Sequence, residues 1–299
     1  MGTLPLDRRG KVGCVNADSE LAPGGVNVDD KFPVPEPLSA HGPARIIAMC
    51  NQKGGVGKTT TAINFGAALA EYGRKVLIVD FDPQGAATVG FGLNALEMET
   101  TVYEVLLNPR LSTKDAIYET EVENLDVLPA NIDLSAAELQ LVNEVARESA
   151  LARVLREVEQ DYDVIIIDCQ PSLGLLAVNA LTAAHGVIIP VATEFFALRG
   201  VALLVETIET VRDRINPRLK IDGIVPTMVD LRTLHSREVL ERLHQAFSDL
   251  VFETEIRRTV KFPDATVAME PILSYASTHP GAEAYRQLAR EVIARGDAP

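Results

Sequence analysis

The residues best suited to chemistry lie in the stretch 45–60, RIIAMCNQKGGVGKTT. An apolar run at 46–50 predicts a buried strand, and glycines follow it before a helical pattern begins. Glycines let several backbone N–H groups turn toward one point, and the positive end of a helix adds to that field. The stretch therefore predicts a phosphate site. Lys58 can reach the β- and γ-phosphates of a nucleotide, and the Thr59 hydroxyl can ligate Mg²⁺.

The loop departs from the usual phosphate-loop pattern, G-x-x-x-x-G-K-[ST]. That pattern needs a glycine at position 52, where this chain has Gln52. The loop instead begins with an additional lysine, Lys53, directly before two glycines. Lys53 could instead be a solvated loop lysine without a function, but the two adjacent glycines favour a functional role for it.

Carboxylates follow two further apolar runs. Asp80 and Asp82 are two residues apart at the end of the predicted strand 75–80, so they point to the same side. Acidic residues at this place can hold Mg²⁺ or orient the water that attacks a γ-phosphate. The run 164–168 ends in Asp168, which is typical of a Walker B strand whose carboxylate binds Mg²⁺ opposite Thr59.

Strand-like and helical patterns alternate along the chain, which predicts an α/β fold with a mostly parallel, doubly wound sheet flanked by helices. This is the three-layer architecture of a P-loop NTPase. The predicted strands are 46–50, 75–80, 125–128, 164–168, 186–191 and 221–227. The predicted helices are 59–72, 135–160 with a break near residue 149, 175–184, 197–215, 234–247 and 282–294. Ligands bind such sheets at the carboxyl ends of the strands, where the candidate residues lie.

Composition bounds the remaining organisation. Residues 1–44 are rich in Pro and Gly and predict a flexible extension, which leaves 45–299 as one ATPase domain. The chain carries a net charge of −14 and three widely spaced cysteines, which disfavours a generally basic protein, a zinc site and an iron–sulfur site. No apolar run approaches the length of a membrane helix, and no apolar segment follows the first basic residues. We therefore expect a cytoplasmic protein.

Three motifs together resemble the ParA/Soj family of deviant Walker A ATPases, which are relatives of MinD. They are the loop 53–60, the segment 80–85 and the sequence IIIDCQPSLG at 165–174. The resemblance continues through EFFALRG at 194–200 and PGAEAY at 280–285, and it spans 45–295. The sequence looks most similar to actinobacterial ParA-like proteins.

The resemblance implies a role for each matching residue. Lys53 would reach the nucleotide of a partner subunit, Asp82 would position the attacking water, and Lys58 would act at the transferring phosphate. The ATP contacts would be Gly54, Gly55, Val56, Gly57, Lys58, Thr59 and Thr60, with Met228 and Asp230 at the base. The Mg²⁺ site would use Thr59 and Asp168, with Asp80 supporting its outer shell. A lysine supplied in trans would tie hydrolysis to formation of a homodimer.

Two segments differ from the usual family pattern. Gln170 stands where relatives usually have the first of two prolines, which adds a polar side chain near the expected dimer face. The segment 255–261 lacks a proline that relatives often carry there, so the base contacts Thr227, Met228 and Asp230 are weakly specified.

The resemblance also implies ATP-dependent DNA binding without sequence preference. The candidate cations are Arg232, Arg257, Arg258 and Lys261, with Arg199 and Arg237 weaker, and a solvated basic face is the alternative. The function expected is chromosome or plasmid segregation or cargo positioning, at the nucleoid in the cytoplasm. A ParB-like protein with a basic N-terminal segment would stimulate hydrolysis, and the acidic surface suits such a segment.

Three alternatives remain open from the sequence. A MinD-like membrane-associated ATPase would need a basic amphipathic helix at its end, and the last residues only complete a domain helix, so no stable membrane anchor is expected. A biosynthetic or metal-delivery ATPase of the same fold is the second alternative, and nitrogenase-reductase-like and scaffold proteins of that class would need bridging cysteines, which are absent. A nucleotide-gated adaptor with little hydrolysis is the third, and Lys58, Asp82 and Asp168 argue against it.

Overall fold

A seven-stranded sheet organises the molecule in the computed structural model, which describes residues 32–95, 97–194 and 197–299. The strand order is β3-β4-β2-β5-β1-β6-β7, and every neighbouring pair is parallel except β3 with β4. The strands are β1 (Arg45–Met49), β2 (Val76–Phe81), β3 (Tyr118–Glu119), β4 (Leu125–Leu128), β5 (Val164–Cys169), β6 (Gly186–Ala192) and β7 (Lys220–Thr227).

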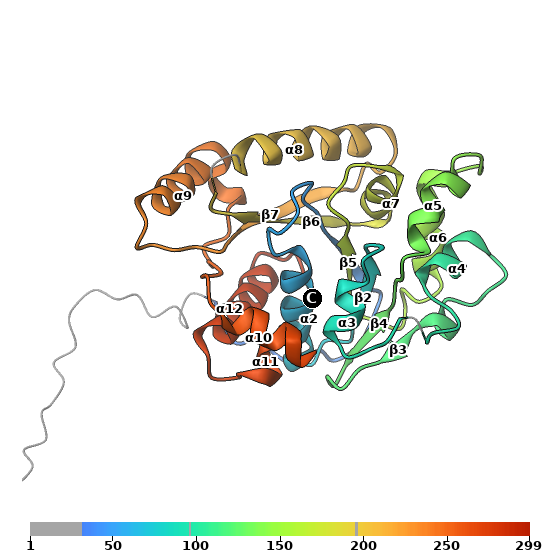
Figure 1. The fold of residues 1–299 in the computed structure, drawn as a ribbon, viewed down its shortest axis with the longest axis horizontal. Coiled ribbons are helices and arrows are strands. Elements are labelled where there is room, and N and C mark those ends of the chain that lie inside the picture. Colours follow the sequence, from blue (N-terminus) through green and yellow to red (C-terminus); the bar gives the residue numbers. More distant parts are fainter. Residues whose placement is uncertain (1–31, 96, 195–196) are drawn as a thin grey trace, which may run out of the picture. The chain divides into compact units, whose positions relative to one another are not determined.

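Helices cover both faces of the sheet (Figure 1). They include α2 (Lys58–Glu71), α3 (Ala86–Gly90), α4 (Val102–Leu107), α5 (Leu134–Leu141), α6 (Ala150–Arg156) and α7 (Leu175–Ala183). The remainder are α8 (Ala197–Arg214), α9 (Leu234–Phe247), α10 (Lys261–Ala268), α11 (Ile272–Tyr275) and α12 (Pro280–Ala294). None of the helices in the described ranges is long and apolar enough to cross a bilayer.

The alternation of side chains along each strand divides the core in two. On β1, Ile46 and Ala48 enter one apolar cluster, and Ile47 and Met49 enter the other. The first cluster packs against α4 to α9, and the second packs against α2, α3 and α10 to α12. Burial on both faces explains why these strands read as continuous apolar runs in the sequence. The predicted three-layer fold is confirmed.

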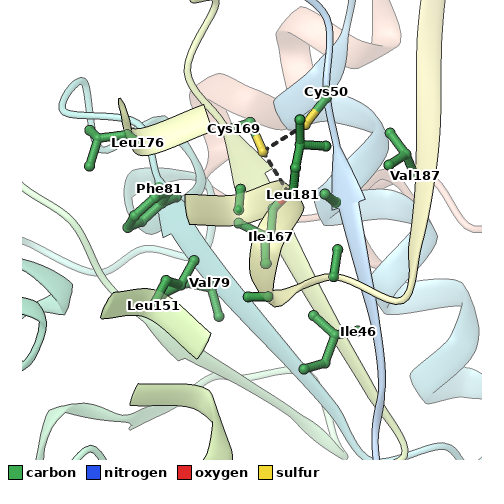
Figure 2. Packing of buried hydrophobic residues seen from close by; sticks show 14 of the residues in the cluster. Ile46, Cys50, Val79, Phe81, Leu151, Ile167, Cys169, Leu176, Leu181 and Val187 are labelled. Carbon is green, nitrogen blue, oxygen red and sulfur yellow. Dashed lines mark hydrogen bonds between the residues drawn. The ribbon is translucent and has the colours of Figure 1, made fainter. Parts of the chain in front are cut away.

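Figure 2 shows part of the first cluster, where β1 and β5 end side by side. Cys50 and Cys169 lie there with their Sγ atoms 3.0 Å apart, and both are free and buried. Cys169 directly follows the candidate residue Asp168, and Cys50 lies three residues before the candidate residue Lys53. The core therefore continues up to the edge of the sheet where the candidate residues lie.

The six predicted strands are all present, and the differences concern short elements. The predicted break near residue 149 in the helical segment 135–160 is present, because an irregular segment and a 3₁₀ turn (Arg147–Ser149) separate α5 from α6, and α6 ends at Arg156 rather than near residue 160. Within that segment Ala146 has a left-handed backbone with φ 55°. Asn179 accepts from Leu151 N–H and donates to Arg147 C=O, which holds the chain in the broken geometry.

The compact unit of the described chain begins at Phe32. Asp163 accepts hydrogen bonds from Gly42 N–H and from Lys75 N–H, and it contacts His41 Nδ1 at 2.7 Å. Ala44 N–H donates to Glu159 C=O. Residues 41–44 thus already pack on the domain, while the predicted flexible extension falls mainly on 1–31, outside the described residues.

Candidate nucleotide site

The phosphate loop connects β1 to α2 at the carboxyl edge of the sheet (Figure 1). Gly55 and Gly57 both have left-handed backbones, with φ values of 71° and 86°. Side chains other than glycine rarely adopt such values, so the glycines allow the loop to turn its N–H groups inward. Thr227 at the end of β7 donates to Val56 C=O at 2.8 Å, which fixes the loop against the sheet.

Lys58 is the first residue of α2 and is 93% buried, since only 7% of it is exposed. Its Nζ donates to Lys53 C=O at 3.2 Å, so the side chain folds back over the loop. Burial lowers the pKa of Lys58, while the nearby charge of Asp168 acts in the opposite direction. A cation held inside the loop in this way is positioned for phosphate oxygens.

Asp168 is fully buried near Lys58, and neither of its carboxylate oxygens has a hydrogen-bond partner among the described residues. Burial, reinforced by the charge of Asp80 on the adjacent strand, raises the pKa of Asp168 to about 8. The Thr59 hydroxyl and the Lys58 ammonium favour the charged form, without a contact of hydrogen-bond geometry to either oxygen. A buried carboxylate without partners is costly, and a bound cation or its water ligands would satisfy it.

Asp80 and Asp82 have different environments although both follow β2. Asp80 is buried and accepts from the N–H and hydroxyl of Thr88 at 2.8 and 2.7 Å and from Asp82 N–H at 3.3 Å. Burial raises the pKa of Asp80 to about 6. Asp82 is half-buried and accepts from Gln84 N–H, which leaves its second oxygen available. Asp80 thus holds the turn that presents Asp82.

Lys53 has a setting opposite to that of Lys58. Its side chain is 43% exposed, and its Nζ contacts Glu194 Oε2 at 2.6 Å, beyond the end of β6. Asn51 supports the start of the loop, because its amide donates to Pro190 C=O and its oxygen accepts from Lys53 N–H. The phosphate loop therefore carries two lysines in different environments: Lys58 is buried within the loop, and Lys53 is exposed at the edge of the loop.

A pocket of about 330 Å³ opens beside the loop. It is lined by Gly57, Thr60, Thr227, Met228, Ile256, Arg257, Arg258, Thr259, Phe262, Pro263, Thr266 and Tyr285. Its lining is mainly apolar, with hydroxyl groups and two arginines, which suits a planar base. The structure brings the predicted contact Met228 into this pocket but not Asp230. The carboxylate of Asp230 binds Arg232 through two contacts of 2.8 Å, and these hydrogen bonds lower its pKa to about 2.

The predicted basic residues gather close to that pocket. Arg232, Arg257 and Arg258 line a second hollow of about 280 Å³. Within the described ranges, three of the four candidate cations have an acidic neighbour: Arg232 pairs with Asp230, Arg258 with Glu194, and Lys261 with Asp264. Arg257 is exposed and forms no such pair with a described residue.

Sequence reasoning did not assign three groups that shape the site. Thr88 satisfies Asp80, Asn51 joins the loop to β6, and Glu194 holds Lys53. Thr88 lies eight residues after Asp80, so only the fold reveals its contact. The signal for Glu194 was available, because an acidic residue follows β6 at the edge where the other candidates lie.

Comparisons with known proteins agree with this geometry. The model of a family described as an AAA domain matches residues 44–221. A relative from Mycobacterium tuberculosis, itself uncharacterised, is 59% identical over 88% of this chain and 83% of its own length. The chromosome partitioning protein ParA of Caulobacter vibrioides is 45% identical over 86% of this chain and 97% of its own length.

A solved structure has the same fold. It is a cobyrinic acid a,c-diamide synthase from Mycobacterium smegmatis with bound ADP and magnesium. It is 43% identical, with a TM-score of 0.74 over 84% of this chain and 94% of its own. The extent of these matches, together with the loop that carries Lys53 and Lys58, shows that the chain belongs to the ParA/Soj family of P-loop partitioning ATPases.

Proposed function

We propose that the protein is an ATPase that forms a homodimer on binding ATP, binds DNA without sequence preference in that state, and returns to the monomer on hydrolysis. The main support for this proposal is the difference in exposure between Lys53 and Lys58. Lys58 is buried within its own cradle, whereas Lys53 lies at the rim, 43% exposed, where it can reach another subunit. The biological role would be chromosome or plasmid segregation or cargo positioning, at the nucleoid in the cytoplasm.

The described residues fit ATP and Mg²⁺. The loop N–H groups and Lys58 would hold the phosphates, and the pocket that includes Met228 would take the base. Thr59 and the unpartnered oxygens of Asp168 would hold Mg²⁺, which neutralises charge on the phosphates. No group of three or more His, Cys, Asp or Glu side chains in the described ranges forms a metal cage, so phosphate and water would complete the coordination.

Hydrolysis would depend on groups from two subunits. Asp82, presented by the turn that Asp80 holds, would orient the attacking water. Lys53 of the partner copy would stabilise charge on the transferring phosphate, and this stabilisation exists only in the dimer. A ParB-like protein with a basic segment would accelerate the reaction.

The test compares Lys53→Ala and Asp82→Ala with the unmodified protein. We expect Lys53→Ala to lose hydrolysis and to dimerise weakly, because the group supplied in trans is missing. Asp82→Ala should lose hydrolysis but remain an ATP-bound dimer that shifts DNA in a gel. ATPase rates, sedimentation velocity and gel shifts measure these properties, with Arg110→Ala on an exposed loop as the control. Normal hydrolysis by Asp82→Ala would reject the water-positioning role.

Two further measurements address the alternatives. Flotation with anionic liposomes in ATP tests a MinD-like membrane role, for which we expect no ATP-dependent association. A gel shift at low salt tests DNA binding, and failure of the ATP-loaded protein to shift DNA there would remove that part of the proposal.

A further inference from the structure

Glu194 lies between Lys53 and Arg258. Its Oε2 is 2.6 Å from Lys53 Nζ, and its Oε1 is 3.8 Å from Arg258 Nη2. The three side chains come from the phosphate loop, from the end of β6 and from the segment before α10. One carboxylate thus joins two segments of the chain to the phosphate loop.

We propose that Glu194 is a positioning residue that retains Lys53 on its own subunit until ATP brings two copies together. This inference rests on the proposed role of Lys53 in trans. In the single chain, Lys53 points to Glu194 rather than into its own cradle. Lys53 must break this contact to reach a partner subunit, so the contact opposes dimerisation.

Arg258 reduces the cost of that release. When Lys53 leaves, the Glu194 carboxylate keeps a cationic neighbour, because Arg258 already lies 3.8 Å from its other oxygen. The side chains of Glu194 and Arg258 are 47% and 61% exposed, so they have room to close the distance. Arg258 would then pair with Glu194 when Lys53 moves to the partner subunit, in addition to any contact that Arg258 makes with DNA.

The exposure of these groups limits the size of the effect. Ion pairs between exposed side chains contribute up to about a five-fold change in an equilibrium constant. Two subunits each release one lysine, so the dimer dissociation constant depends on the product of two such factors. Loss of the Glu194 charge should therefore lower that constant about two- to thirty-fold.

The experiment measures dimerisation by sedimentation velocity, without DNA, in Mg²⁺ and a non-hydrolysable ATP analogue. We expect Glu194→Gln, which keeps the shape and removes the charge, to dimerise at a lower protein concentration. Glu209→Gln on α8 is the matched control, because Glu209 is also exposed and pairs with an arginine, Arg212, at 3.8 Å. Arg258→Ala should dimerise about two-fold more weakly or worse, an effect that a DNA contact alone would not produce. Because Arg258 also lines the pocket beside the phosphate loop, this variant is compared at a saturating concentration of the analogue.

Lys53→Ala separates this inference from the proposed function. In a Lys53→Ala background, Glu194→Gln should have no further effect, because there is no lysine left to retain. If Lys53→Ala alone dimerises normally, the proposed function fails. If Lys53→Ala weakens the dimer while Glu194→Gln leaves it unchanged or weaker, the role of Lys53 stands and the role of Glu194 is rejected.

Discussion

Asp168 and Asp222 are both buried aspartates, but their hydrogen-bond partners differ. Asp168 has no hydrogen-bond partner in the described ranges and lies at the carboxyl edge of the sheet, where a cation would satisfy it. Asp222 lies near the start of β7 and pairs with Arg45 at 2.7 Å, although its Oδ2 has no partner in those ranges. The first carboxylate fits a ligand site, and the second ties β1 to β7.

The Asp222 pair predicts a pH dependence of stability. Burial outweighs the Arg45 charge and raises the pKa of Asp222 from 3.8 to about 7. Between these two values the folded protein keeps a proton that the unfolded chain has lost, so the free energy of unfolding falls as the pH rises. Between pH 5 and pH 8 the free energy of unfolding should fall in the unmodified protein by about 2.5 kcal/mol more than it falls in Asp222→Asn.

Urea unfolding without nucleotide at both pH values measures this difference. Asp133→Asn, at an exposed position, is the control. An equal fall in Asp222→Asn and in the unmodified protein would show that Asp222 does not titrate in this range.

At the scale of elements, the sequence predicts the long segments and misses the short ones. The six strands buried on both faces could be read from apolar runs, and so could long helices such as α2 and α9. The two residues of β3 carry no pattern, because their pairing depends on β4. The short helix α4 did have a readable signal, a capping box between Thr101 and Glu104, whereas α10 and α11 depend on packing against other parts of the chain.

The sequence likewise predicts some residues of the nucleotide site and misses others. Lys58, Asp82 and Asp168 could be placed from strand ends because parallel strands bring their carboxyl ends to one edge. The sequence predicts Asp230 as a contact of the base, but nothing in the sequence shows that Arg232 binds both oxygens of its carboxylate. Contacts between distant segments, such as Glu194 with Lys53, require the fold.

The turn between β2 and α3 predicts a substitution effect. Gly85 has φ 62°, and a Cβ there would lie 2.8 Å from Ala130 C=O. We expect Gly85→Ala to lose about 2–4 kcal/mol of stability, from backbone strain and from this contact. The displaced turn would also misplace Asp82 and slow hydrolysis about ten-fold or more.

Gly73→Ala is the matched control for that substitution. Gly73 has φ 78°, but a Cβ there meets nothing within 4 Å. It should therefore lose only about 1–2 kcal/mol and keep its hydrolysis rate. Thermal unfolding and ATPase rates of the two variants test this, and equal losses in both would show that the contact with Ala130 has no effect.

For the whole molecule, acidity and dimerisation together determine how DNA would be bound. The chain carries a net charge of −14, so its exposed cations act against a repulsive background. The candidates Arg232, Arg257, Arg258 and Lys261 lie near the pocket beside the phosphate loop, and three of them share their charge with an acidic neighbour. A single copy therefore offers a small attractive surface, and two copies offer twice as much.

This doubling predicts how salt weakens DNA binding. Each phosphate contact contributes about −0.9 to the slope of log K against log salt, so a dimer using all eight cations approaches a slope of roughly −7. Lys53→Ala, which we expect to dimerise weakly, should show a shallower slope that approaches half that value at protein concentrations where single copies dominate. Arg257→Ala removes two contacts from a dimer, so it should make the slope shallower by about 2, whereas Arg110→Ala should leave it unchanged.

Fluorescence anisotropy of a labelled duplex over a range of KCl concentrations measures these slopes. Equal slopes for the unmodified protein and Arg257→Ala would exclude Arg257 from the contact, and equal slopes for Lys53→Ala would separate DNA binding from dimerisation.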